Sequence, residues 1–191
     1  MTDSETQTRG TPDPAVSLND ERSVLLEALR QHRTLFRVTV QGLDDDQARL
    51  RPTASELSLG GLIKHVCAVE AEWARFVVEG PADGPGVDWA NIDWSNPPAE
   101  VVAHQDGFIM REDETLPGLL AAYDEVAAAT DALVASVDLD TRWPLPEAPW
   151  FESGKSWSAR RAFLHIVAET AQHAGHADIL RETLDGQKTM G

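Results

Sequence analysis

FLHIVAETAQHAGHADIL, residues 163–180, predicts an amphipathic helix that carries polar side chains on its apolar face. An α-helix turns by about 100° per residue, so Glu169, His173 and His176 fall on one arc. The aliphatic residues on the same arc are Ala162, Ile166, Leu180 and Leu184. Such an arc is buried in a folded protein, and a carboxylate with two imidazoles is costly to bury without partners. A metal ion would provide that partner, and it would need a further ligand from elsewhere in the chain.

A second helix, predicted over residues 58–79, offers this ligand. Ser58 is a good N-cap, and Gly80 followed by Pro81 ends the helix. His65 lies within an apolar face whose other members are Leu62, Val66, Val69, Trp73 and Phe76. The histidine is therefore predicted to point into the protein.

His65, Glu169 and His173 together form a candidate metal site. Two ligands four residues apart on one helix and a third from a facing helix leave coordination positions open for water or substrate, as in catalytic zinc sites. These ligand types suit zinc, and they also suit nickel, iron or cobalt.

The residues alone leave other interpretations open. His65 could be an ordinary hydrogen-bonded core histidine, and Glu169 with His173 could form a buried pair without a metal. His165 and His176 lie on the same arc and compete as ligands, or as groups that hydrogen-bond to a ligand from outside the metal site.

Four amphipathic segments predict an all-α protein, specifically a four-helix bundle. They span about residues 18–40, 58–79, 115–136 and 158–184. Short helical pieces are predicted at Asp44–Asp46 and after Asn96, and no segment has a convincing strand pattern. The connection 81–114 is long for a compact domain, which is typical of a functional segment or a crossover between helices two and three. We expect a disordered leader over residues 1–16 and a single domain over residues 17–191.

The composition restricts the partners and the compartment. The chain has 16 basic and 32 acidic side chains, for a net charge of −16, which argues against nucleic acid and against an anionic membrane surface. No apolar stretch approaches the roughly 20 residues of a membrane span, and no secretory signal is evident. Cys67 is the single cysteine and is interpreted as a packing residue. We therefore expect a cytoplasmic protein.

Two motifs carry a resemblance to a known superfamily. The stretch Ser58–Val66, followed by Glu70 and Trp73, resembles the second helix of the DinB/YfiT-like superfamily. The stretch His173–Glu182, followed by Asp185-Gly186, resembles the fourth helix of an actinobacterial branch of that superfamily. The resemblance covers nearly the whole chain after the leader and implies a four-helix bundle with parallel second and third helices.

The resemblance also implies a metal site and a chemistry. Many members of the superfamily hold a metal with three histidines, one on helix two and two on helix four. Here Glu169 stands at the first of the helix-four positions, which matches the His, Glu, His zinc set of the superfamily's mycothiol-dependent maleylpyruvate isomerases. Related members transfer bacillithiol or mycothiol, and dimers are common.

The expectation is a divalent-metal enzyme that uses a low-molecular-weight thiol, such as mycothiol, on a small electrophile. It would act as an S-transferase or an isomerase, with zinc as the first choice of metal and nickel as a substitute in purified protein. A non-catalytic metal- or ligand-binding bundle and a metal-free helical interaction protein are the alternatives. The sequence singles out no catalytic base, and a homodimer rests on the resemblance alone.

The pocket is expected at the end of the bundle that carries residues 43–57 and the approach to helix three, residues 101–114. Trp89 and Trp94 are candidates for its walls. The candidate polar groups there are His104, Asp106 and Arg111. The tryptophans expected at the opposite end are Trp143, Trp150 and Trp157.

Overall fold

The computed structural model describes residues 14–82, 87–89 and 91–189, with side chains from residue 21 onward. Across these residues the protein is a four-helix bundle, which confirms the all-α prediction. The long helices are α1 (Pro14–Val38), α3 (Leu59–Glu79), α5 (Leu116–Ser136) and α6 (Ala159–Asp185). The short elements are α2 (Asp45–Arg49), α4 (Ala99–Asp106), β1 (Arg142–Pro144) and β2 (Ser156–Ser158). No helix in this part of the chain is both long enough and apolar enough to cross a membrane.

The N-terminal segment differs in part from the expectation. The helix predicted from about residue 18 begins at Pro14, inside the segment expected to be a leader. Proline fits the first turn of a helix because its missing N–H has no intrahelical acceptor there. Residues 1–13 of the expected leader lie outside the described residues.

Local capping explains where three of the long helices begin. The hydroxyls of Ser58, Thr115 and Ser158 accept hydrogen bonds from backbone N–H groups in the first turns of α3, α5 and α6. Each such cap stabilises a helix by about 1 kcal/mol. At the other ends, Gly80 and Gly186 have φ angles of 78° and 82°, a region that side chains disfavour. The predicted bounds of these three helices therefore agree with the structure to within one residue.

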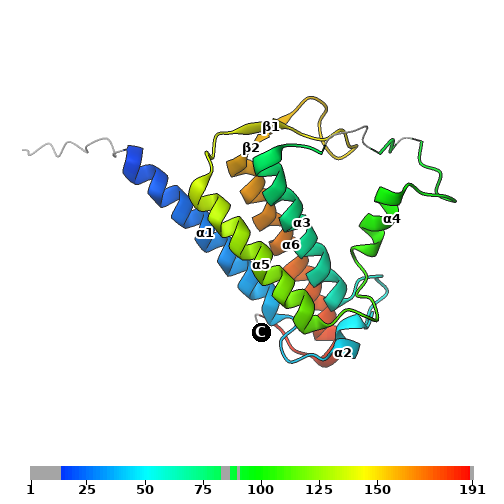
Figure 1. Ribbon diagram of the computed structural model, residues 1–191. Coiled ribbons are helices and arrows are strands. Elements are labelled where there is room, and N and C mark those ends of the chain that lie inside the picture. The colour runs from blue at the N-terminus through cyan, green and yellow to red at the C-terminus, as the bar shows by residue number, and fades with distance from the viewer. Residues whose placement is uncertain (1–13, 83–86, 90, 190–191) are drawn as a thin grey trace, which may run out of the picture.

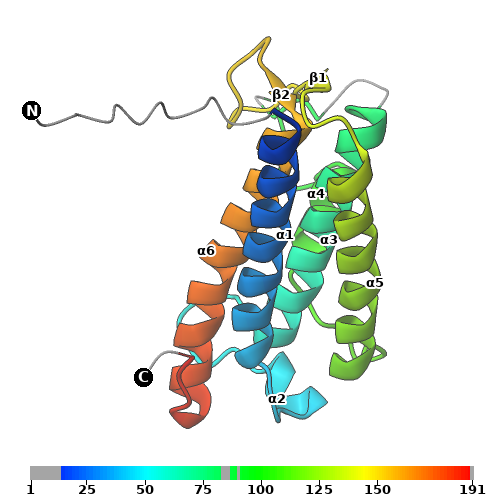
Figure 2. The ribbon, with the colours of Figure 1, turned by 90° about the vertical axis from the view of Figure 1, so that its left-hand side faces the viewer.

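The directions of the four long helices place their ends in two groups. Figure 1 shows α1 and α6 descending while α3 and α5 ascend, so α3 and α5 are parallel, as the resemblance implies. Contacts agree with this arrangement: Arg160 pairs with Glu21 near the starts of α6 and α1. Arg181 donates to the carbonyls of Thr39 and Gln41 near their ends, at 3.0 and 2.9 Å. The connection from α3 to α5 must travel the length of the bundle, and it carries α4 along the outside (Figures 1 and 2).

The bundle core consists of two apolar clusters on either side of a buried ion pair. The lower cluster, on the side of α2, includes Leu62, and the upper cluster, on the side of the strands, includes Phe163. Between them, Arg33 of α1 donates to both carboxylate oxygens of Glu70 of α3, at 3.1 and 2.5 Å. Arg33 also donates to Asp131 of α5 at 2.8 Å. This network links three of the four long helices at mid-height.

The prediction that the chain has no strand is wrong. β1 and β2 pair antiparallel, with Trp143 opposite Trp157. Each strand has three residues, which is too short for an alternating pattern to stand out in the sequence. The pair holds the connection between α5 and α6 over the upper end of the bundle (Figure 1).

Candidate metal centre

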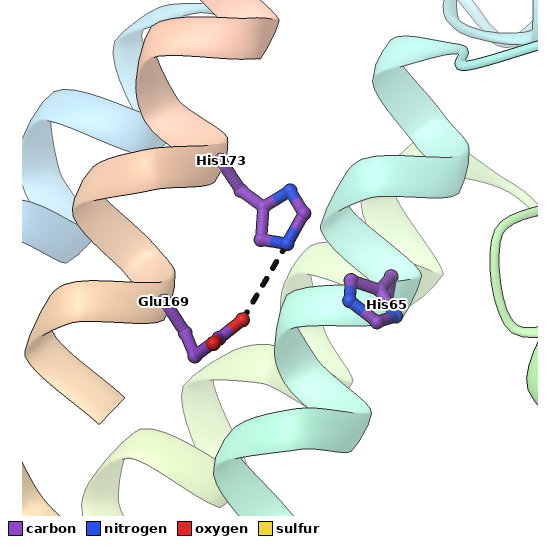
Figure 3. Close-up of side chains that lie close together, drawn as sticks. All are labelled: His65, Glu169 and His173. Atoms are coloured by element: carbon purple, nitrogen blue, oxygen red, sulfur yellow. Dashed lines mark ion pairs between the residues drawn. The ribbon is translucent and has the colours of Figure 1, made fainter. Parts of the chain in front are cut away.

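Three side chains from two helices converge inside the bundle. His65 comes from α3, and Glu169 and His173 come from successive turns of α6 (Figure 3). Each side chain offers one ligand atom, and these atoms all lie within 4.8 Å of one another. The structure thus brings together the three residues that the sequence singles out.

The donor set is close to the size that a divalent ion requires. Two atoms bound to one zinc ion lie about 3.4 Å apart in a tetrahedral site, and at most about 4.3 Å apart. His173 Nε2 already lies 3.6 Å from Glu169 Oε2. The whole set spans up to 4.8 Å, so the donors would draw together by about 0.5 Å on binding one ion. Two imidazoles and a carboxylate are ligand types that suit zinc or nickel.

The protonation states also suit a cation. His65 is 7% exposed. Burial, with the nearby His173 and His104, lowers the pKa of His65 to about 4, so its imidazole is neutral at pH 7. The contact with His173, and then the proximity of His165, lowers the pKa of Glu169, which is therefore ionised. Glu169 therefore brings a negative charge to the donor set.

Two further histidines of α6 contact the donor set from outside. His165 Nε2 lies 3.5 Å from Glu169 Oε1. His176 Nδ1 lies 3.4 Å from His173 Nδ1. Within the part of the chain that is described, the group of mutually close donors contains neither His165 nor His176. Both are placed to orient a ligand through its second polar atom, which is a common arrangement around metal sites.

The α3–α5 connection contributes a ring that the sequence analysis missed. Phe108 stacks on His65 with ring centroids 3.7 Å apart and an interplanar angle of 21°. His104 of α4, which was expected near the pocket, lies edge-on to His65 at 6.0 Å. An isolated phenylalanine in a long connection has no periodic pattern, so the sequence gives no sign of this contact.

The other expected pocket groups lie beside the donor set rather than in it. Arg111 pairs with Asp106 at 2.8 Å. Both line an open depression of about 670 Å³ between α4 and the start of α3. The remaining lining residues are Lys64, Ala99, Val102, Ala103, Gly107 and Glu114. None of the three candidate ligands is among them.

The expected position of Trp89 is wrong, whereas Trp143, Trp150 and Trp157 lie with the β1–β2 connection, opposite to α2, as expected. Trp89 packs against Trp150, with ring centroids 4.7 Å apart, so it belongs with the β1–β2 connection. Trp94 is 68% exposed and does not wall the donor set. Trp157 is closer to the site than expected, because its ring lies 5.0 Å from that of His165. The β pair, which the sequence analysis did not predict, carries Trp157 to this position.

Cys67 does not take part in the candidate site. Its side chain packs against the lower core cluster, in agreement with the interpretation as a packing residue. Burial, and then the charge of Glu70, raises the pKa of Cys67 to about 11. The thiol is therefore protonated at neutral pH and is a poor nucleophile.

Comparison with known proteins shows which family and which fold this chain matches. Residues 24–186 match the Mycothiol-S-transferase family. The fold resembles the crystal structure of a conserved protein from Enterococcus faecalis, with a TM-score of 0.60 and 14% identity over 86% of this chain and 97% of that one. That likeness concerns the fold alone, and no curated protein matches the chain. The family match runs from within α1 to the end of α6 and includes the candidate ligands, so the chain belongs to the Mycothiol-S-transferase family, which is DinB-like.

Proposed function

We propose that this protein is a metal-dependent S-transferase that joins a mycothiol-type thiol to a small electrophile. His65, Glu169 and His173 would hold a divalent cation, with zinc as the first choice and nickel as a substitute. The observation that carries the proposal is the convergence of these three donors within 4.8 Å in a chain of the Mycothiol-S-transferase family.

A cation held by these three donors could also bind and activate a thiol. A bound divalent cation would lower the pKa of a thiol in contact with it, so that the reactive thiolate is available at neutral pH. The three residues bring one negative charge and therefore neutralise only half of the charge of such a cation. Three protein donors would leave the fourth position of a four-coordinate ion for water or a thiol, as in catalytic zinc sites.

The overall reaction balances without a redox partner. The thiol releases its proton to water, a carbon–sulfur bond forms, and the leaving group departs from the electrophile with its electron pair. With an electrophile that has no leaving group, addition of sulfur followed by its elimination would give an isomer of the substrate. The first of these outcomes, S-transfer, is the one that the family match favours.

The remaining expectations stay parts of the proposal. A net charge of −16 favours a small-molecule substrate over nucleic acid or an anionic membrane. A single cysteine is typical of a protein that needs no disulfide, which favours the cytoplasm. A homodimer stays a prediction that rests on the resemblance to the superfamily.

Metal analysis of protein purified without a histidine tag tests the first half of the proposal. We expect about one equivalent of divalent metal in the wild type and its loss in His65→Ala and in His173→Ala. His32→Ala on α1 is the matched control and should retain the metal. Wild-type protein without metal would favour the metal-free helical interaction protein.

A conjugation assay tests the second half. The protein is incubated with mycothiol and a small alkyl halide, and the thioether and the released halide are measured. We expect equal amounts of both products at a rate that His65→Ala reduces to background. Metal without conjugation for any thiol tested would instead favour a non-catalytic metal-binding bundle.

A further inference from the structure

The connection between α3 and α5 lies directly on the first turn of α3, at residues 107–110. Two glycines make this approach possible. A Cβ atom on Gly61 would lie 1.9 Å from the carbonyl oxygen of Phe108, and one on Gly60 would lie 2.3 Å from Met110 Sδ. Side chains at these two positions would therefore push the connection away from the helix.

Polar contacts from the same helix, α3, also hold this segment. Lys64 Nζ donates to the carbonyl of Ile109 at 3.1 Å and pairs with Glu114 at 2.8 Å. Glu114 in turn accepts a hydrogen bond of 2.7 Å from the backbone N–H of Arg111. Met110 is buried in the lower core cluster. The segment 107–114 is thus docked on α3 by backbone, ionic and apolar contacts.

His65 depends on this segment more than the other candidate ligands depend on their surroundings. His173 has polar neighbours at both ring nitrogens, Glu169 at 3.6 Å and His176 at 3.4 Å. Among the described residues, no hydrogen-bond partner is found for either ring nitrogen of His65. Its closest ring contact is the stack on Phe108, at 3.7 Å and 21°. Metal-binding histidines usually have their orientation fixed by a hydrogen bond from the second nitrogen.

We propose that Phe108 is a positioning residue for His65. Its ring, docked through the Gly60–Gly61 pair, fixes the plane of the imidazole and takes the place of the hydrogen bond that usually orients a metal-binding histidine. The long connection therefore completes the metal centre. This inference rests on the metal site of the proposed function.

Zinc affinity of the apo-protein tests the inference without any measurement of transfer activity. The dissociation constant for zinc is measured by competition with a chromophoric chelator. Phe108→Leu and Phe108→Met keep an apolar side chain and remove the ring, and we expect zinc binding about 10 to 100 times weaker, as for other groups that orient a ligand. Phe108→Tyr restores a ring and should bind zinc within about threefold of the wild type. Ile109→Ala, next to it and 40% exposed, is the matched control and should change nothing.

A second readout reports the stack itself. A ring 3.7 Å above an imidazole shifts the carbon-bound ring protons of His65 upfield in the NMR spectrum. Phe108→Leu should remove this shift in the apo-protein, and Phe108→Tyr should retain it. Thermal unfolding of each variant without metal accounts for any general loss of stability.

The outcomes separate this inference from the proposed function. Unchanged zinc affinity in Phe108→Leu and Phe108→Met, with a lower melting temperature, would show a structural role only and overturn the inference while leaving the metal site intact. Equal weakening in Phe108→Tyr and Phe108→Leu would also overturn it. Weaker zinc binding restored by the tyrosine would support it, even if no conjugation is found. A wild type that binds no zinc would overturn both.

Discussion

His65 of α3 and His173 of α6 face each other across the bundle, edge to face, with ring centroids 4.9 Å apart. Glu169 lies one helical turn from His173 and contacts it at 3.6 Å. Two imidazoles and one carboxylate from two helices are thereby gathered in a half-buried space. A cation bound there would link α3 to α6, so metal content and bundle stability would be coupled.

Metal should raise the melting temperature of this protein. A ligand at 100 times its dissociation constant stabilises the folded state by about 2.7 kcal/mol. For a chain of this size that corresponds to roughly 5–10 °C. The melting temperature of the wild type should fall by this amount when a chelator removes the metal. The melting temperature of His173→Ala should be the same with and without zinc. His32→Ala should behave as the wild type, and an equal zinc effect in His173→Ala would place the ion elsewhere.

Removal of one partner of the Arg33–Glu70 pair should strongly destabilise the folded protein. Both side chains are buried, and Glu70→Ala leaves the Arg33 guanidinium with only Asp131 as a partner. We expect a loss of about 3–5 kcal/mol in the free energy of unfolding, measured with urea. The double variant Arg33→Met, Glu70→Leu should recover most of it, because no charge is then left unpaired in the core.

An exposed ion pair provides the comparison for that experiment. Arg75 and Glu79 lie four residues apart on α3 at 3.6 Å, with both side chains largely in solvent. Glu79→Ala should change the free energy of unfolding by less than about 1 kcal/mol. A similar loss in Glu79→Ala and Glu70→Ala would contradict the role assigned to burial.

Two glycine-to-alanine changes should act in opposite directions. At Gly61 the new Cβ would meet the backbone carbonyl of Phe108 at 1.9 Å, which only a displaced connection can relieve. At Gly175, inside α6, a Cβ meets nothing within 4 Å. Gly61→Ala should therefore destabilise the protein by more than about 2 kcal/mol and weaken zinc binding, whereas Gly175→Ala should stabilise it by about 0.5–1 kcal/mol. Stabilisation by Gly61→Ala would contradict the docking of residues 107–110.

The docked connection should also loosen in acid. Burial acts to raise the pKa of Glu114, but its hydrogen bonds to Lys64 and Arg111 outweigh this effect, and the net pKa is lowered from 4.5. A carboxyl group with a depressed pKa contributes stability above its unfolded-state pKa, and this contribution is lost as the pH falls through the folded-state value. Above about pH 5, the free energy of unfolding of the wild type should exceed that of Glu114→Gln by up to roughly 1 kcal/mol. This difference should begin to fall near pH 4.5 and disappear once the pH is below the folded-state pKa, and a difference that grows toward low pH would contradict the assignment.

Local features of the sequence account for what could be predicted. The long helices follow from apolar periodicity, and their starts follow from Ser58, Thr115 and Ser158, whose caps involve residues three positions away. The Glu169–His173 pair follows from helix geometry alone. His65 could be added because a single histidine within an apolar face must point toward another helix.

Contacts between distant segments account for what was missed. The β pair joins residues 142–144 to 156–158 across a proline-rich connection, and no local sequence pattern predicts this pairing. Phe108 contacts His65 only because Gly61, 47 positions earlier in the chain, has no side chain that would clash with the backbone of Phe108. Trp157 and His165 come together through the same β pair. The ring contacts around the candidate ligands therefore depend on tertiary packing, whereas the candidate ligands themselves could be picked out from the sequence.

Anomalous scattering from crystals of untagged protein, measured on both sides of the zinc absorption edge, would show whether His65, Glu169 and His173 share one zinc ion. The proposed site requires one peak between α3 and α6, about 2.0–2.2 Å from a nitrogen of His65, an oxygen of Glu169 and a nitrogen of His173. A zinc peak bound by other residues, or no peak in zinc-supplemented crystals in which these side chains are ordered, would contradict it.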